Sequence, residues 1–169
     1  EILKKLKKKL LIFDLDGVLI DSKANMRSSW KKVQDKHNLN KIPFEYYFRH
    51  IGRPFYDILK LLGIKKELKE IKKTYDSESI KNIRKINFYK NTVSILRILK
   101  NKKYKLGILT SKDYSRTKKF LKKNKNFFSI IICDDNKSKG KPHPFQINKM
   151  INNLNVNKKD CVYIGDTNI

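Results

Sequence analysis

The chain has 169 residues, and its 41 Lys and Arg residues against 16 Asp and Glu residues give it a formal net charge of +25. Its length suits one domain, or one domain with an inserted module, and its 39% hydrophobic content excludes a disordered basic tail. Only six of the 41 basic residues are arginines and alanine occurs once, so the excess of lysine indicates nucleotide bias in the genome more than a surface built for nucleic acid.

The N-terminal segment, Glu1 to Leu11, alternates Leu and Ile with lysine pairs and lacks an apolar run long enough for a signal peptide or a membrane span. We expect a solvated leader there, with attachment to an acidic membrane surface as the alternative. The two cysteines, Cys133 and Cys161, are too few for a disulfide scaffold or a zinc site, so we expect free thiols in a reducing, cytoplasmic location.

Four short runs of continuously apolar residues predict buried strands of a parallel sheet. These runs are Leu10–Phe13, Leu106–Leu109, Ser129–Cys133 and Cys161–Ile164. Apolar residues at helical spacing lie before the second run, after it and before the fourth run, around 93–99, 120–121 and 147–154. This alternation predicts an α/β fold with a doubly wound parallel sheet.

The segment 22–86 contains no strand-like run, but apolar residues at helical spacing occur around 58–62 and 68–75. We predict a helical module at 22–86, inserted into a core made of residues 1–21 and 87–169. His50 is expected to be structural, with a position in a cleft as the alternative. The aromatic residues expected to form the core of the module are Trp30, Phe44, Tyr46, Tyr47, Phe48, Phe55 and Tyr56.

Two acids follow the first predicted strand in the motif Phe13-Asp14-Leu15-Asp16-Gly17. Acids at i and i+2 of a strand end project to the same side, where open α/β sheets bind ligands. Two carboxylates this close require a cation between them or a proton on one of them. The pair therefore suits a magnesium-assisted nucleophile beside a proton-transferring acid, and a turn or helix cap is the alternative.

Polar residues also follow the other predicted strands. Thr110 and Ser111 offer hydroxyl groups to an anion at a helix N-terminus, with ordinary N-caps as the alternative. Lys141 lies between a glycine and a proline, which fixes it as a point charge for phosphate, although coincidence is a serious alternative in a lysine-rich chain. Asp166 follows the last strand and offers an oxygen ligand to a hard cation, with a cap again the alternative.

In this order, the acid pair, hydroxyl, lysine and acid resemble the motifs of the haloacid dehalogenase-like superfamily over residues 10–169, and residues 13–22 resemble its phosphatase branch. The insertion point resembles the subgroup with a helical cap, which includes phosphoglycolate phosphatases and beta-phosphoglucomutases. The resemblance implies a Rossmannoid core and a Mg²⁺-dependent phosphatase that hydrolyses a small phosphorylated metabolite through an aspartyl-phosphate. A phosphosugar mutase, a basic nucleic-acid-binding protein and a non-catalytic remnant remain the alternatives.

The resemblance also implies roles for single residues. Asp14 would be the nucleophile, and Asp16 would protonate the leaving group and then activate water. Thr110 would hydrogen-bond the transferring phosphoryl group, Ser111 would support its loop, and Lys141 would neutralise its charge. The Mg²⁺ ligands would be Asp14, the carbonyl of Asp16, and Asp166.

In the expected cap, Ile51-Gly52-Arg53-Pro54 resembles the loop that closes over the substrate. Gly52 would permit close approach and Arg53 would recognise an anionic or hydroxylated group, unless Arg53 is one more surface cation. The family's fourth motif continues to a second acid a few residues beyond Asp166, whereas this chain ends at Ile169. We therefore expect a truncated copy or an incomplete gene fragment with weak metal binding and poor turnover.

Overall fold

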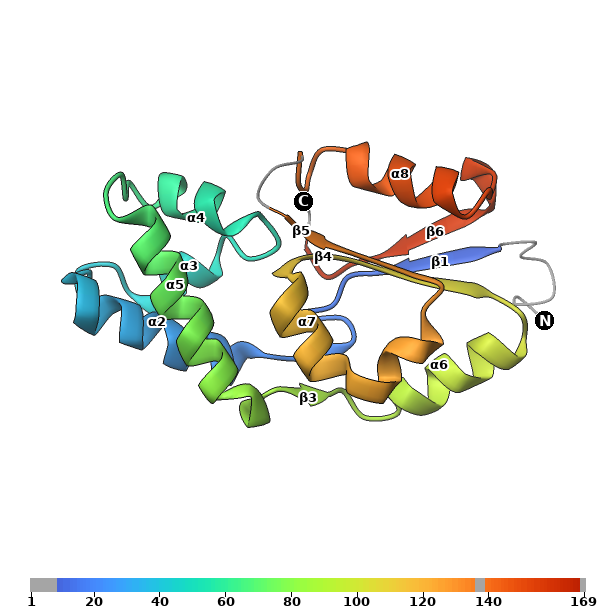
Figure 1. Cartoon of the computed structure of the whole chain (residues 1–169), viewed down its shortest axis with the longest axis horizontal. Helices are drawn as coiled ribbons and strands as arrows, with labels where there is room; N and C mark the ends of the chain where they lie inside the picture. The colour runs from blue at the N-terminus through green and yellow to red at the C-terminus, as the bar shows by residue number, and fades with distance from the viewer. Residues whose placement is uncertain (1–8, 136–138, 168–169) are drawn as a thin grey trace.

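Four parallel strands form the central sheet of the computed structural model, which describes residues 9–135 and 139–167 (Figure 1). The strands are β1 (Leu10–Phe13), β4 (Lys105–Asp113), β5 (Ile130–Asp134) and β6 (Cys161–Ile164), in the order β5-β4-β1-β6. The doubly wound α/β fold and its four predicted strands are confirmed. The expected N-terminal leader falls largely on residues 1–8, outside the described residues.

Helices cover both faces of the sheet, which is why its strands are apolar on both sides. Helix α8 (Phe145–Asn153) lies on one face, and α6 (Thr92–Asn101) and α7 (Tyr114–Leu121) lie on the other (Figure 1). Alternate side chains of β1 point to opposite faces of the sheet. Leu10 and Ile12 pack in the hydrophobic cluster that contains Met150 of α8, whereas Phe13 packs in the cluster on the face covered by α6 and α7.

One glycine lets α8 approach the sheet closely. A Cβ atom on Gly107 of β4 would lie 2.6 Å from Sδ of Met150. Met150 is fully buried at this contact. A larger residue at position 107 would push α8 away from the strands that carry the polar motifs.

The helices of residues 22–86, which we call the helical cap, lie to one side of the sheet (Figure 1) and enclose a hydrophobic cluster of their own. Trp30 is fully buried and stacks on Tyr47 with ring centroids 4.5 Å apart. The expectation that Tyr46 belongs to the core of the cap is wrong. Its side chain is 50% exposed, because it lies on the outer side of a five-residue helix, where its contact is with Arg49. The cap helices are α2 (Lys23–His37), α3 (Phe44–Phe48), α4 (Phe55–Leu61) and α5 (Leu68–Lys81).

A short antiparallel ribbon connects the helical cap to the sheet. Strand β2 (Ile20–Asp21) pairs with β3 (Asn87–Phe88), so the chain leaves the core and returns to it through one ribbon. Strands of two residues carry no readable periodicity, and the sequence did not predict them. We propose that this ribbon marks the division between the core and the cap.

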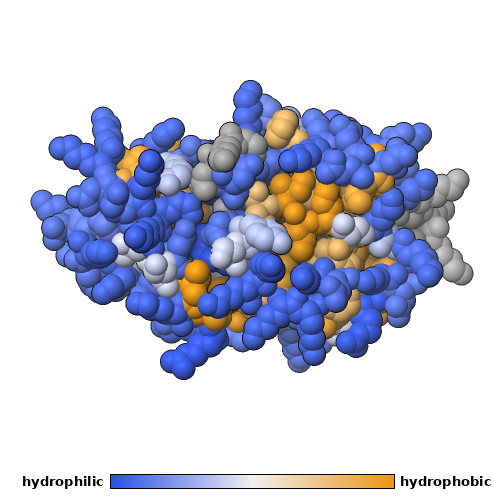
Figure 2. All heavy atoms as spheres, in the orientation of Figure 1, coloured by the Kyte–Doolittle hydropathy of each residue, from blue (hydrophilic) through white to orange (hydrophobic). Residues whose placement is uncertain are grey.

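The remaining elements are short 3-10 helices, and the outer surface is strongly polar. These helices are η1 (Ile83–Lys85), η2 (Lys122–Phe127) and η3 (Lys158–Asp160). Figure 2 shows a mainly hydrophilic face with several apolar areas, the largest of them over the region of the sheet. The isoleucines of β5 are half-buried. Strand β6 is an edge strand of the described sheet, and its Tyr163 is 37% exposed. Within the described ranges, no helix has the length and apolar character needed to cross a bilayer.

Candidate active site

The site begins at the carboxyl end of β1, where the backbone of Asp14 is held by the sheet. Its N–H donates to the carbonyl of Ile164 in β6 at 2.9 Å. Its side chain is 4% exposed, with Oδ1 accepting from the N–H of Leu15 at 2.7 Å and Oδ2 from Nζ of Lys141 at 2.5 Å. Burial raises the pKa of Asp14 above its ordinary value, and Lys141 opposes that rise. Lys141 is thus brought to Asp14 across 127 positions of sequence.

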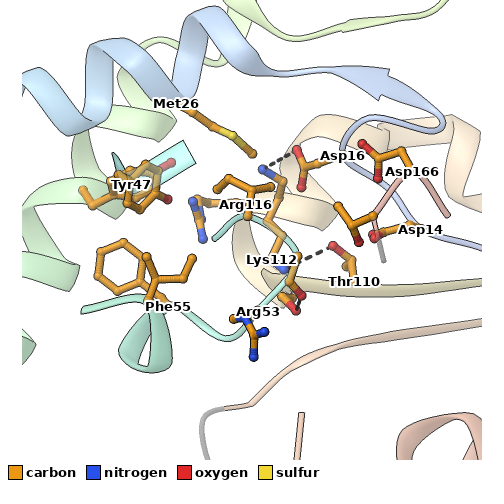
Figure 3. Close-up of a pocket in the computed structure, with 16 residues that line it drawn as sticks. Asp14, Asp16, Met26, Tyr47, Arg53, Phe55, Thr110, Lys112, Arg116 and Asp166 are labelled. Carbon is orange, nitrogen blue, oxygen red and sulfur yellow. Dashed lines mark hydrogen bonds and ion pairs between the residues drawn. The ribbon is translucent and has the colours of Figure 1, made fainter. Parts of the chain in front are cut away.

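Asp16 has a lysine of its own. Its Oδ1 accepts a hydrogen bond from the Ser22 hydroxyl and lies 3.0 Å from Nζ of Lys112, which is 5% exposed. The two acids of the motif thus face two different buried lysines, Lys141 beside Asp14 and Lys112 beside Asp16. Figure 3 shows the pair formed by Asp16 and Lys112 beside Asp14 and Asp166.

At the end of β4, Thr110 and Ser111 are not the N-cap of the next helix, which was the alternative to a binding role. The strand continues through Thr110 to Asp113, with an irregular register between these residues. Helix α7 begins at Tyr114, and its N-cap is Asp113, whose carboxylate accepts from the N–H of Arg116 at 3.0 Å. Thr110 is 1% exposed, accepts from the N–H of Lys112 at 3.1 Å and lines the pocket.

Ser111 joins the core to the loop of the helical cap. Its hydroxyl donates to the carbonyl of Gly52 at 2.5 Å, and Gly52 adopts a φ of 101°. On the other side of the loop, a Cβ atom on Gly140 would lie 2.6 Å from Cγ of Pro54. Arg53 between these contacts lines the pocket, and its guanidinium has no ion pair or hydrogen bond with any residue that the structure describes.

Asp166 lies against the turn that follows Asp16. Gly17 has a φ of 83°, and a Cβ atom there would lie only 1.8 Å from Oδ2 of Asp166. The Asp166 carboxylate is exposed, lines the pocket and accepts no hydrogen bond within residues 9–135 and 139–167. The turn therefore requires glycine both for its backbone and for the space that Asp166 occupies.

The donor set at this edge fits a hard divalent cation. Over the described ranges, no three Asp, Glu, His or Cys side chains gather as a metal-binding cluster. The expected set needs only two carboxylates, those of Asp14 and Asp166, together with the backbone carbonyl of Asp16. All are oxygen donors of the kind that Mg²⁺ prefers, and Asp166 has no competing partner among the described residues.

The pocket lies between the helical cap and the core and encloses a cavity of about 50 Å³. Figure 3 shows the carboxylates of Asp14, Asp16 and Asp166 on one side and the aromatic cap residues Tyr47 and Phe55 on the other. A cavity of this size holds only a few water molecules. The described structure thus presents a small site that is partly open to solvent.

Comparison with known proteins assigns the family. The sequence profile described as "Haloacid dehalogenase-like hydrolase" matches residues 11–169. The chain belongs to the haloacid dehalogenase-like hydrolase family. It is therefore an enzyme of a hydrolase family, and the resemblance found in the motifs is confirmed.

Several relatives of this haloacid dehalogenase-like hydrolase carry phosphatase names. "Pyrophosphatase PpaX" of Bacillus cereus (strain B4264) is 28% identical over 167 residues, covering 92% of this chain and 73% of that protein. A hydrolase structure from Pseudomonas syringae has a TM-score of 0.83 at 25% identity, covering 95% of this chain and 77% of that one. A "predicted phosphoglycolate phosphatase" from Haemophilus somnus has a TM-score of 0.80 at 21% identity, covering 96% and 78%, and shows the common fold.

Two pocket residues of this haloacid dehalogenase-like hydrolase were missed in the sequence. Lys112 directly follows Thr110 and Ser111, but nothing local separates it from the many solvated lysines. Arg116 is 7% exposed and lies on α7, where its pattern resembles that of an ordinary surface helix. His50, by contrast, lies in a separate surface hollow with Tyr46 rather than in the pocket.

Proposed function

We propose that this chain is a Mg²⁺-dependent phosphatase that hydrolyses a small phosphomonoester through an aspartyl-phosphate on Asp14. The observation that carries the proposal is the buried contact of 2.5 Å between Lys141 Nζ and Asp14 Oδ2 at the carboxyl edge of the sheet. It places a fixed carboxylate and a fixed positive charge where a phosphoryl group enters. Phosphoryl transfer depends on such positioning and charge neutralisation.

In this mechanism an Asp14 oxygen attacks phosphorus while the bond from phosphorus to the leaving oxygen breaks. Asp16 delivers a proton to the leaving oxygen, then takes one from the water that hydrolyses the aspartyl-phosphate. Lys141 balances the charge of the phosphoryl group, and the Thr110 hydroxyl donates to one of its oxygens. The hydrogen bonds from Leu15 and Lys141 fix the Asp14 carboxylate beforehand.

Mg²⁺, when bound, supplies further charge neutralisation of the phosphoryl oxygens. Asp14, the carbonyl of Asp16 and Asp166 would hold it. Ser22 and Lys112 would keep the Asp16 side chain directed into the pocket. Because it is half-buried and bonded on two sides, that side chain would reach the leaving group without a large rotamer search.

Pyrophosphate is a second candidate substrate, because the PpaX relatives are named pyrophosphatases. The guanidinium of Arg53 lines the pocket and has no partner among the described residues, which favours a leaving group that carries negative charge. The small cavity favours a leaving group of few atoms. Both pyrophosphate and a small carboxylated phosphomonoester meet these two conditions.

The test is phosphate release from a panel containing p-nitrophenyl phosphate, phosphoglycolate, pyrophosphate and glucose 1-phosphate, with MgCl₂ or with EDTA. We expect Mg²⁺-dependent release that Asp14→Asn reduces at least about a hundred-fold. The matched control is Asp21→Asn, because Asp21 is an exposed acid outside the pocket. It should retain activity within about two-fold. Normal turnover by Asp14→Asn, or no release from any substrate, would overturn the proposal.

A further inference from the structure

A buried arginine connects the core to the helical cap at the back of the pocket. Arg116 on α7 is 7% exposed, and its guanidinium binds carboxylates from both parts of the molecule. Asp113 of the core accepts a hydrogen bond from Nε of Arg116, and Oδ1 of Asp76 on α5 lies 3.3 Å from the same nitrogen. A buried charge of this kind requires such partners, because losing them leaves it desolvated and unpaired.

The cap side of this contact is part of the pocket wall. The Arg116 guanidinium carbon lies 5.4 Å from the ring centroid of Tyr75, which precedes Asp76 on α5. Tyr75 lies next to Tyr47 and Phe55, with ring centroids 5.6 Å and 5.0 Å away. All three aromatic residues and Arg116 line the pocket. A shift of α5 away from Arg116 would therefore move the whole cap wall of the site.

The contact can also break without isolating a charge. Oδ2 of Asp76 lies 2.6 Å from Nζ of Lys72 on its own helix. Arg116 keeps Asp113, which lies at the start of its own helix. Oδ1 of Asp76 accepts no well-formed hydrogen bond among the described residues, so its link to Arg116 is an ion pair without directional geometry. Separation of the cap from the core leaves each charged group with a local partner.

We propose that Arg116 is a positioning residue that, through its ion pair with Asp76, holds the helical cap closed over the catalytic carboxylates. Closure would be reversible, because substrate enters and product leaves between the helical cap and the core, where the pocket lies. The Ser111–Gly52 hydrogen bond is another contact across the same boundary. The expected effect on the reaction rests on the proposed phosphatase function, whereas the effect on closure does not.

The test compares Asp76→Asn with Asp113→Asn as its matched control. Each removes one carboxylate from Arg116, but only Asp76 lies on the cap, and asparagine retains the capping function at position 113. We expect hydrogen exchange of the segment 49–58 to accelerate about five-fold or more in Asp76→Asn and to stay near wild type in Asp113→Asn. Asp76→Glu, which restores the charge, should return exchange toward wild type.

Two further readouts separate positioning from simple destabilisation. Trp30 is the one tryptophan in the chain and is buried in the cap, so its fluorescence during urea unfolding reports whether each variant folds. With p-nitrophenyl phosphate, Asp76→Asn should raise KM about five-fold and change kcat less than about two-fold. Unchanged exchange or unchanged KM in Asp76→Asn, or equal acceleration in Asp113→Asn, would overturn the proposal. A wild-type protein that releases phosphate from no substrate of the panel would contradict the function, and the exchange experiment would still decide the closure.

Discussion

Burial distinguishes two lysines from the other lysines that the structure describes. Lys112 and Lys141 are 5% and 8% exposed, and each faces an aspartate of the same motif. A lysine that leaves water loses hydration, and a carboxylate partner is what offsets that loss. At the scale of single residues, the site therefore consists of two buried ion pairs, Lys141 with Asp14 and Lys112 with Asp16.

Gly17 provides a residue-scale prediction, because Asp166 occupies the space where a Cβ would lie. Gly17→Ala combines an unfavourable positive φ with a clash 1.8 Å from Oδ2 of Asp166. Gly63→Ala is the matched control, since Gly63 has a φ of 74° but no atom within 4 Å of its Cβ position. Both variants should lose about 1–2 kcal/mol in urea unfolding. Only Gly17→Ala should also lose phosphate release, by about a hundred-fold, because it displaces a proposed Mg²⁺ ligand.

Equal phosphate release by the two alanine variants would contradict this role of Asp166. The unfolding data make the comparison independent of general damage, because both substitutions carry the same backbone strain. A difference in activity at similar stability would then arise from the carboxylate alone.

Cys133 gives a prediction about pH. Burial raises the pKa of its thiol from 9.0 to about 11. At pH 8 about one thiol in a thousand is then ionised, and only the thiolate reacts readily with iodoacetamide. We expect labelling of Cys133 to be slow at pH 8 and to rise about ten-fold per pH unit up to about pH 11. Site-resolved mass spectrometry measures it, and rapid labelling in the folded protein at pH 8 would contradict the raised pKa.

The same pKa shift has a defined sign for stability. The folded state keeps the Cys133 thiol neutral to about pH 11, whereas the unfolded thiol ionises near pH 9.0. Ionisation of the unfolded state alone favours unfolding. This contribution of Cys133 is therefore fully present below about pH 9 and is lost as the pH rises toward 11.

At the scale of elements, the packing of α8 on β4 depends on Gly107. We expect Gly107→Ala to lower the free energy of unfolding by about 1–3 kcal/mol, because its Cβ would overlap the Met150 side chain. Met150→Ala alone should cost about 2–5 kcal/mol by creating a cavity. In the double variant the new methyl group fills part of that cavity, so its loss should be smaller than the sum. Urea unfolding of the three variants measures this, and strict additivity would contradict the direct contact.

The elements also show which parts of the fold the sequence could predict. The four strands of the sheet were predictable because burial on both faces makes each strand continuously apolar. The two-residue strands β2 and β3 were not, since they are defined only by pairing between distant segments. Strand β4 extends through polar residues to Asp113 because its pairing with β5 continues as far as Asp134. No local pattern of apolar residues reports that pairing.

The residues of the candidate site also fall into those that the sequence could predict and those that it could not. Asp14, Thr110, Lys141 and Asp166 were predictable because parallel strands bring their carboxyl ends to one edge of the sheet. The partners of these motifs were harder to predict: Lys112 and Arg116 acquire their importance from burial against acids elsewhere in the fold. Their selection depends on tertiary contacts, which a local motif does not encode.

At the scale of the whole molecule, the net charge of +25 surrounds a site whose expected substrate is an anion. Such a field attracts anionic esters over distances comparable with the Debye length. That length falls from about 30 Å at 0.01 M salt to about 8 Å at 0.15 M. Long-range attraction should therefore contribute to substrate capture at low salt and fade as salt increases, whereas the buried Lys141–Asp14 pair is screened much less.

The resulting prediction separates capture from chemistry. Between about 0.01 M and 0.15 M KCl, kcat/KM for p-nitrophenyl phosphate should fall about three- to ten-fold, while kcat changes little. Potassium acetate at equal ionic strength is the control, because screening depends on ionic strength whereas competition for the site depends on the anion. Matching declines in the two salts would assign the effect to the charge of the whole molecule. A value of kcat/KM that stays constant with salt would show that the lysine excess plays no part in substrate capture, leaving the two buried lysines as the functional share of the positive charge.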